Sequence, residues 1–122
     1  MRYKIIIEYD GTPFVGWQRQ DNGLSVQECI ETAIESMFQE KPVLFGAGRT
    51  DAGVHATGQV AHVDIEHKEI DTYSIKTGLN HHLKIYPISV LDVTEVDAEF
   101  HSRFDAKERK YLYRIVNRNS PL

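Results

Sequence analysis

The sequence has few of the residues that cross-link a chain, and no stretch that would anchor it in a membrane. Its one cysteine, Cys29, excludes an internal disulfide and gives no support for a zinc site. No apolar run approaches the ~20 residues that a membrane-spanning helix needs, and no signal-peptide pattern opens the sequence. We therefore expect a globular, cytoplasmic chain in which Cys29 is a small buried side chain.

An excess of positive charge is also lacking. The net charge of −4 at pH 7 argues against a nucleic-acid binder, because phosphate contacts supply most of the affinity of such proteins. The distribution is uneven, since residues 101–122 carry +4 and residues 1–100 carry −8. A solvated basic strand and a charged partner for this segment explain the asymmetry equally well. The basic side chains concerned are Arg103, Lys107, Arg109, Lys110, Arg114 and Arg118.

The most unusual stretch that is present is glycine-rich and spans residues 46–58. Arg49 and Asp51 lie at its centre, and four glycines surround them. Glycine permits positive φ and close approach of another group, so we expect a tight loop between two strands. A guanidinium near a carboxylate keeps the carboxylate ionised and fixes its direction. From these residues alone, a salt-bridged turn without catalytic function is the simpler interpretation.

The hydrophobic pattern predicts an α+β domain over residues 1–118, with residues 119–122 leading out of it. The helix predicted at 26–39 starts with a capping box at Ser25, and a second helix starts at Asp71. This order predicts a mostly antiparallel sheet with two helices on one face. Alternation of apolar and polar residues, together with short apolar runs, predicts strands at 2–9, 43–45, 59–66, 85–96 and 109–117.

Several side chains around these elements have predicted environments. Phe14 and Trp17 are expected to anchor the long loop at 10–24 to the core. Two sets of polar residues are expected to be solvated, and no metal is expected at the second set although His67 follows it. The sets are Glu28, Glu31 and Glu35 on the first helix, and His62, Asp64 and Glu66 on the strand at 59–66.

The octapeptide GRTDAGVH at 48–55 resembles the signature of the tRNA pseudouridine synthase A family. The resemblance covers nearly all 122 residues, but members of this family are about twice as long, so the chain resembles their N-terminal half. Where the family commonly has a proline after the position of Leu83, this sequence has Lys84. Further matching segments are YDG at 9–11, GWQRQ at 16–20, SVQE at 25–28, FHSRF at 100–104 and RKYLY at 109–113.

The resemblance implies a ferredoxin-like half of a homodimeric enzyme that converts uridine into pseudouridine in tRNA. The implied targets are anticodon stem-loop uridines at tRNA positions 38 to 40, and the implied reaction needs neither metal nor cofactor. The resemblance assigns the catalytic carboxylate to Asp51, its oriented partner to Arg49, and a base-stacking ring to Tyr111. Candidate RNA-binding side chains are Arg19, Arg103, Lys107, Arg109 and Lys110.

Two other functions compete with this interpretation. A hydrolase could use Asp51 with His55, but a glycosidase normally needs a second positioned carboxylate, and no motif supplies one. The main alternative is a catalytically silent RNA-binding module of ferredoxin-like fold. The Arg49–Asp51 pair argues against that alternative, because RNA binding alone gains nothing from a carboxylate near phosphates.

Overall fold

The computed structural model describes residues 1–48, 53, 55–66 and 70–102, and in these ranges the chain follows a βαββαβ order. The strand predicted at 109–117 lies outside the described residues. The elements are β1 (Arg2–Tyr9), α1 (Val26–Phe38), β2 (Leu44–Gly46), β3 (Ala56–Asp64), α2 (Thr72–Leu83) and β4 (Ile88–Val96).

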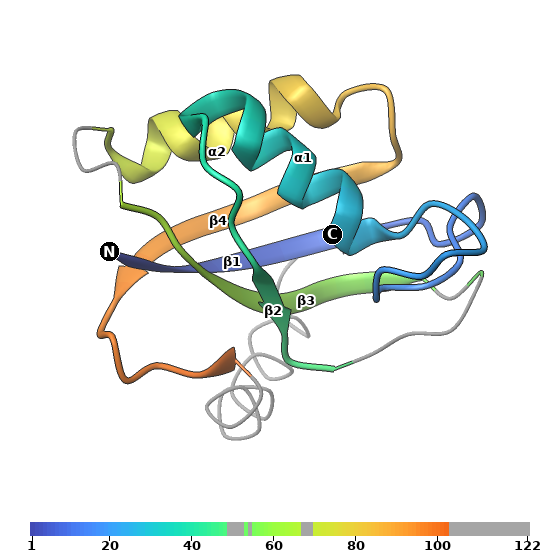
Figure 1. Ribbon diagram of the computed structural model, residues 1–122, viewed down its shortest axis with the longest axis horizontal. Helices are drawn as coiled ribbons and strands as arrows, with labels where there is room; N and C mark the ends of the chain where they lie inside the picture. The colour runs from blue at the N-terminus through green and yellow to red at the C-terminus, as the bar shows by residue number, and fades with distance from the viewer. Residues whose placement is uncertain (49–52, 54, 67–69, 103–122) are drawn as a thin grey trace, which may run out of the picture.

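The described strands form one antiparallel sheet in the order β2-β3-β1-β4. Ile5 in β1 lies opposite Ala61 in β3 on one side and Val93 in β4 on the other. Both helices cover the same face of this sheet (Figure 1). This is the ferredoxin-like βαββαβ topology, so the predicted α+β class with two helices on one face is confirmed.

The core lies between the two helices and the sheet. The period-two pattern of β1 puts Tyr3, Ile5, Ile7 and Tyr9 on the helix side, and each is at most 3% exposed. Burying an aliphatic side chain of this size contributes about 1.5–3 kcal/mol. The helix side chains in the same core cluster include Ile30, Ile34, Ile75, Leu79 and Leu83.

Both helices begin where the sequence predicts. The Ser25 hydroxyl accepts a hydrogen bond from the Glu28 N–H at 3.1 Å, and an Asp71 carboxylate oxygen accepts one from the Ser74 N–H at 2.8 Å. Each cap satisfies a backbone donor that the first helical turn leaves unpaired. Among the described residues, no helix has the length and apolar character needed to cross a bilayer.

Other predictions concern element ends and single side chains. Phe14 and Trp17 are buried as predicted, and Cys29 is buried too, with a pKa that burial raises to about 11. The predicted strand at 85–96 is too long, since residues 84–87 form a turn and β4 starts at Ile88.

Two polar residues predicted to be solvated are buried, and these predictions are wrong. Glu31 is 8% exposed and His62 is 2% exposed. Segments distant in sequence cover both, namely the approach to β2 over Glu31 and residues 100–102 over His62. Periodicity within one element does not report such coverage.

Candidate functional site

The glycine-rich stretch connects β2 to β3, as a hairpin whose base is well fixed. The Ala47 N–H donates to the Val60 carbonyl at 2.7 Å, which extends the pairing beyond β2. The Gln59 side-chain amide donates to the Gly48 carbonyl at 2.6 Å. Arg49 and Asp51 lie outside the described residues, so their contact remains a prediction.

The returning side of this loop is attached to residues 10–14. The Gly53 N–H donates to the Phe14 carbonyl at 3.4 Å, with φ of 80° at Gly53. His55 Nδ1 accepts a hydrogen bond from the Gly11 N–H at 2.9 Å and lies 3.0 Å from an Asp10 carboxylate oxygen. His55 thus holds the loop against the segment after β1, which differs from the role that a hydrolase would give it.

Two glycines at the start of the loop have different environments. A Cβ at Gly46 would lie 2.6 Å from Nε1 of the buried Trp17, so packing requires glycine there. A Cβ at Gly48 would meet none of the described residues within 4 Å, and the φ of Gly48 is not positive. Neither packing against the described residues nor a positive φ therefore requires glycine at this position.

A buried carboxylate supports β2 from the helix side. Glu31 Oε2 accepts hydrogen bonds from the Leu44 N–H at 2.9 Å and from the Gln27 amide at 3.2 Å. The same Gln27 amide donates to the Leu44 carbonyl at 3.2 Å. Both outward-facing backbone groups of Leu44 are therefore satisfied by α1, which blocks another strand from pairing there. The spacing of Gln27 and Glu31 places them on one helix face, but the sequence alone did not identify their target.

Arg19 is the one predicted RNA-binding residue within the described ranges. Its guanidinium lies 2.7 Å from a Glu31 carboxylate oxygen and 3.4 Å from one of Glu28, and its side chain is 54% exposed. The hydrogen bond to Glu31 is the main cause that raises the pKa of Arg19. Its charge is already paired, and its contact with RNA stays a prediction. The other predicted RNA-binding residues, and Tyr111, lie outside the described ranges.

The sheet face opposite the helices carries a second buried polar group. His62 Nδ1 lies 3.1 Å from the Ser102 nitrogen and 2.8 Å from its hydroxyl oxygen. The His62 ring stacks on that of Phe45, with centroids 5.0 Å apart. Burial, and then the positive charges of Arg2 and His101, lower the pKa of His62 from 6.5 to about 4.

No metal site forms around this histidine within the described ranges. No group of three His, Cys, Asp or Glu side chains there is arranged to hold a metal ion. Asp64, a member of the predicted solvated set, pairs instead with Arg2 at 2.8 Å and is well exposed. His67 lies outside the described residues.

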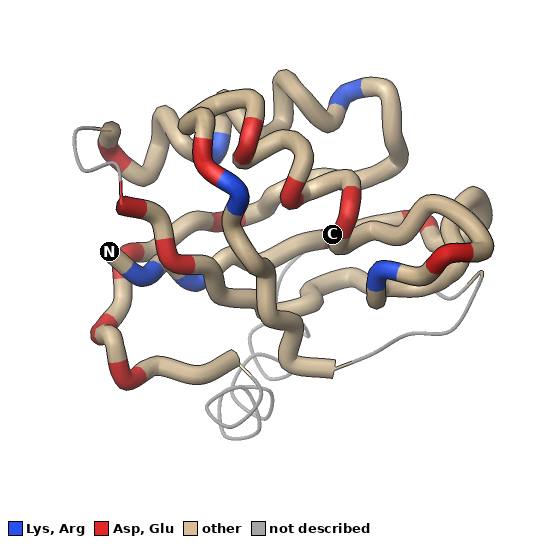
Figure 2. Tube along the Cα trace, viewed as in Figure 1, with Lys and Arg blue, Asp and Glu red and all other residues tan. Residues whose placement is uncertain are grey.

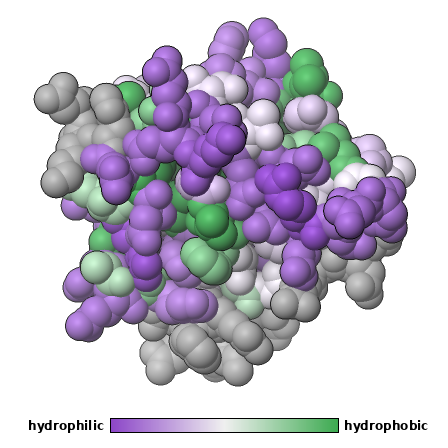
Figure 3. Space-filling view, in the orientation of Figure 1, coloured by the Kyte–Doolittle hydropathy of each residue, from purple (hydrophilic) through white to green (hydrophobic). Residues whose placement is uncertain are grey.

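A groove of about 810 Å³ follows the outer edge of β2 beside the glycine-rich loop. Charged side chains are absent from its described lining. In the space-filling view a small apolar area lies near the centre of a mainly hydrophilic face (Figure 3). The described lining residues are Trp17, Gln18, Gln27, Val43, Leu44, Phe45, Gly46, Ala47, Gly48 and His101.

The described residues thus form a ferredoxin-like βαββαβ unit. The sequence that contains Arg49 and Asp51 connects its strands β2 and β3. The family model described as tRNA pseudouridine synthase matches residues 5–105. The chain belongs to the tRNA pseudouridine synthase family, as its motifs predict.

Individual relatives agree with this assignment. The chain is 54% identical to tRNA pseudouridine synthase A of Paramagnetospirillum magneticum, over 99% of the chain and 47% of the relative. It is 53% identical to the protein of the same name from Ehrlichia ruminantium, over 100% of the chain and 50% of the relative. It is 50% identical to the tRNA pseudouridine synthase A of Maricaulis maris, over 99% of the chain and 48% of the relative. The chain spans about half the length of the curated relatives it matches.

Proposed function

We propose that this chain provides the catalytic half of an enzyme that isomerises uridine to pseudouridine in tRNA. The observation that carries the proposal is the family match over residues 5–105, which includes an intact GRTDAGVH sequence. The β2–β3 hairpin that presents this sequence has a fixed base, through the bonds of Ala47 and Gln59. Packing against the described residues does not require glycine at position 48, which is compatible with approach of a substrate to the loop.

The reaction breaks the N1–C1′ bond of a uridine, turns the uracil, and joins C5 to C1′, while C5 loses a proton and N1 gains one. Reactant and product are isomers, so the overall change needs no redox cofactor. Asp51 supplies the carboxylate, as nucleophile or as base, and Arg49 keeps it ionised and directed. Tyr111 holds the detached uracil by stacking, which is worth ~1–3 kcal/mol for a base on an aromatic ring. The uridine must leave the helical stack to reach these groups.

The finer parts of the proposal concern the substrate and assembly. The targets are uridines at tRNA positions 38 to 40 in the anticodon stem-loop, and the enzyme acts as a homodimer. Arg49, Arg103, Lys107, Arg109 and Lys110 contact phosphates while the base is flipped, and Arg19 is a further candidate for such a contact. Transcripts that carry uridine at one of these positions, compared with transcripts that carry none, test the position assignment.

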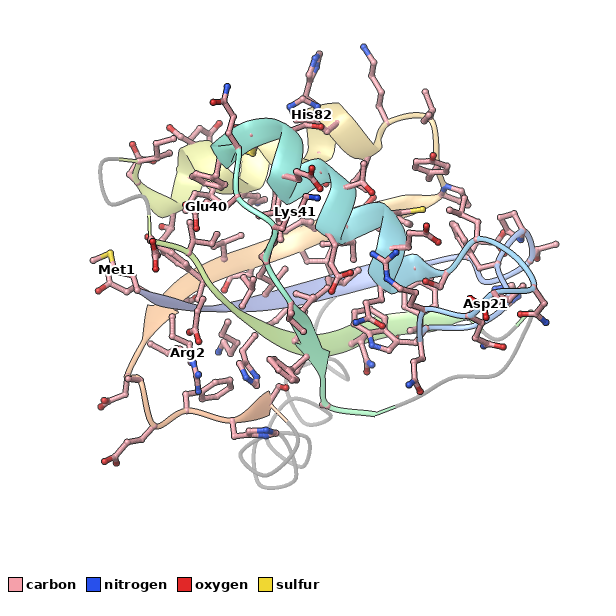
Figure 4. All side chains as sticks on the ribbon, viewed as in Figure 1. Met1, Arg2, Asp21, Glu40, Lys41 and His82 are labelled. Atoms are coloured by element: carbon pink, nitrogen blue, oxygen red, sulfur yellow. The ribbon has the colours of Figure 1, made fainter. Side chains whose placement is uncertain are left out.

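The first prediction tests Asp51 in the longest form of the protein that the gene encodes. Asp51→Asn keeps the size of the side chain and removes its charge, so tRNA should still bind while isomerisation falls by several orders of magnitude. Pseudouridine is measured by mass spectrometry of the digested tRNA, and binding by filter retention. Asp21→Asn, at an exposed position of the loop at 10–24, is the matched control and should leave turnover unchanged (Figure 4).

Two results would contradict the proposal. Turnover of Asp51→Asn within about tenfold of the wild type would remove Asp51 from the reaction. Wild-type protein that binds tRNA and converts no uridine would favour the silent RNA-binding module.

A further inference from the structure

Residues 97–102 cross the sheet face that the helices leave open, and β1 fixes them there. Arg2 donates one hydrogen bond to the Phe100 carbonyl at 2.6 Å and two to the Asp64 carboxylate, at 2.8 and 2.9 Å. Figure 4 shows Arg2 near the start of β1, on the side of this segment. The Arg2 guanidinium therefore connects residues 97–102 to both β1 and β3.

His62 and Ser102 make the second attachment, and both are buried. The Ser102 N–H donates to His62 Nδ1 at 3.1 Å. The single hydrogen of the Ser102 hydroxyl can be donated either to the same Nδ1, at 2.8 Å, or to the Phe45 carbonyl, at 2.9 Å. An imidazole nitrogen that accepts a hydrogen bond carries no proton, so this geometry requires neutral His62. Protonation at Nδ1 would place two hydrogens against each other.

The attachment joins the two parts of the chain that carry the proposed catalytic residues. Phe45 and His62 are cross-strand partners at the base of the hairpin, and Phe45 precedes Asp51 by six residues. Ser102 precedes Tyr111 by nine residues. The contacts of Ser102 with His62 and Phe45 fix it on β2 and β3 at the base of the hairpin.

We propose that His62 is a positioning residue for the isomerisation, whose neutral imidazole fixes Ser102 against Phe45 at the base of the β2–β3 hairpin. This inference rests on the proposed function. His62 itself does not contact the substrate. The charged and titratable groups around its ring are Arg2 from β1, Asp64 from β3 and His101 from the covering segment.

Two substitutions separate positioning from packing. His62→Phe keeps a ring to stack on Phe45 and removes the acceptor, whereas His62→Asn keeps an oxygen near the place of Nδ1 and removes the ring. If His62 only fills space, Phe is the better replacement. If it positions Ser102, Asn is better, with kcat within about threefold of the wild type, while Phe lowers kcat by about tenfold or more.

The measurements use the longest form of the protein, with kcat and KM determined well below the unfolding temperature of every variant. Hydrogen exchange of the Ser102 amide is measured in parallel and should accelerate by about tenfold in His62→Phe but less in His62→Asn. Leu79→Ala, in the core between α2 and the sheet, controls for lost stability and should keep the wild-type kcat at these temperatures.

Each outcome decides between the hypotheses. Equal or higher kcat for His62→Phe than for His62→Asn overturns the inference, as does unchanged exchange of the Ser102 amide in both variants. If the wild type is active and either of these outcomes is found, only the positioning role of His62 is overturned and the proposed function stands. A wild type that converts no uridine overturns the proposed function and the positioning role with it.

Discussion

His62 links the protonation state of one side chain to the stability of the fold. Its pKa is lowered from 6.5 to about 4 by burial and by the charges of Arg2 and His101, so the folded state favours the neutral imidazole. Between these pH values the unfolded chain binds more protons than the folded one. Stability therefore rises with pH across this window and is lost as the pH falls from 7 to 4.

We expect this group to account for roughly 1–3 kcal/mol of the change between pH 7 and pH 4. Urea unfolding at intervals of pH measures it, and His62→Asn should flatten the curve in this window. Asp64, whose pKa is lowered mainly by its hydrogen bond with Arg2, acts in a lower range, because its contribution is lost only as the pH falls through its folded pKa. Equal slopes for wild type and variant would contradict the assignment.

Glu31 is a second residue whose charge matters because of where it is buried. Glu31→Gln keeps one acceptor for the Leu44 N–H but removes the charge that faces Arg19. We expect a loss of about 1–3 kcal/mol in the free energy of unfolding, the usual cost of disturbing a buried, charged hydrogen-bond group. Glu35→Gln, on the exposed side of the same helix, should change it by less than about 0.5 kcal/mol. Similar losses in Glu31→Gln and Glu35→Gln would show that the buried hydrogen bonds of Glu31 add no particular stability.

At the scale of elements, the start of the loop after β2 allows packing and function to be separated. Gly46→Ala would force a methyl group against the buried Trp17 ring and should cost about 1–3 kcal/mol of stability. Gly48→Ala meets no described side chain and should leave the thermal midpoint nearly unchanged, but it should slow isomerisation. Thermal unfolding and pseudouridine formation measure the two effects. Full turnover in the Gly48→Ala variant would remove the argument for close approach at this glycine.

Local signals in the sequence were sufficient for most of the elements. Ser25 and Asp71 start helices because their side chains cap backbone donors within three residues, and β1 is buried on one side because its apolar residues alternate. Such interactions involve neighbours in sequence, so a pattern can reveal them. The family motif located the loop at 46–58 in the same way.

The environments of Glu31 and His62 were not predictable in this way. Glu31 is buried because the start of β2 and Arg19 lie against it, and His62 because Ser102, 40 residues away in sequence, covers it. In both cases the partner is set by tertiary packing, which no local spacing specifies. The contact between Arg49 and Asp51, and the place of Tyr111, remain predictions.

For the whole molecule, the two edges of the described sheet differ. Gln27 and Glu31 satisfy Leu44 at the β2 edge, while β4, Ile88–Val96, forms the other edge. An exposed apolar sheet edge or face promotes self-association. The hydrogen bonds from α1 argue against strand pairing at the β2 edge. We therefore expect any self-association at β4 or at the sheet face opposite the helices. Acidic side chains outnumber basic ones along the described trace (Figure 2).

The last prediction concerns the 122-residue chain without any additional half. Its helices are capped and β1 alternates cleanly between buried and exposed residues, so residues 1–118 should fold alone and unfold cooperatively on heating. We do not expect this chain to be a competent enzyme. Its net charge is −4, and concentrated basic charge is confined to residues 101–118, which is too little for firm binding of a structured RNA at physiological salt.

The test compares the 122-residue chain with the longest form of the protein on the same tRNA, at low and at physiological salt. The chain alone should show a cooperative thermal transition, weak tRNA binding that salt abolishes, and little or no pseudouridine. A longer form should restore turnover, because about half the length of the curated relatives lies outside this match. Comparable rates would show that residues 1–122 build the complete site, and the additional half would then act outside catalysis.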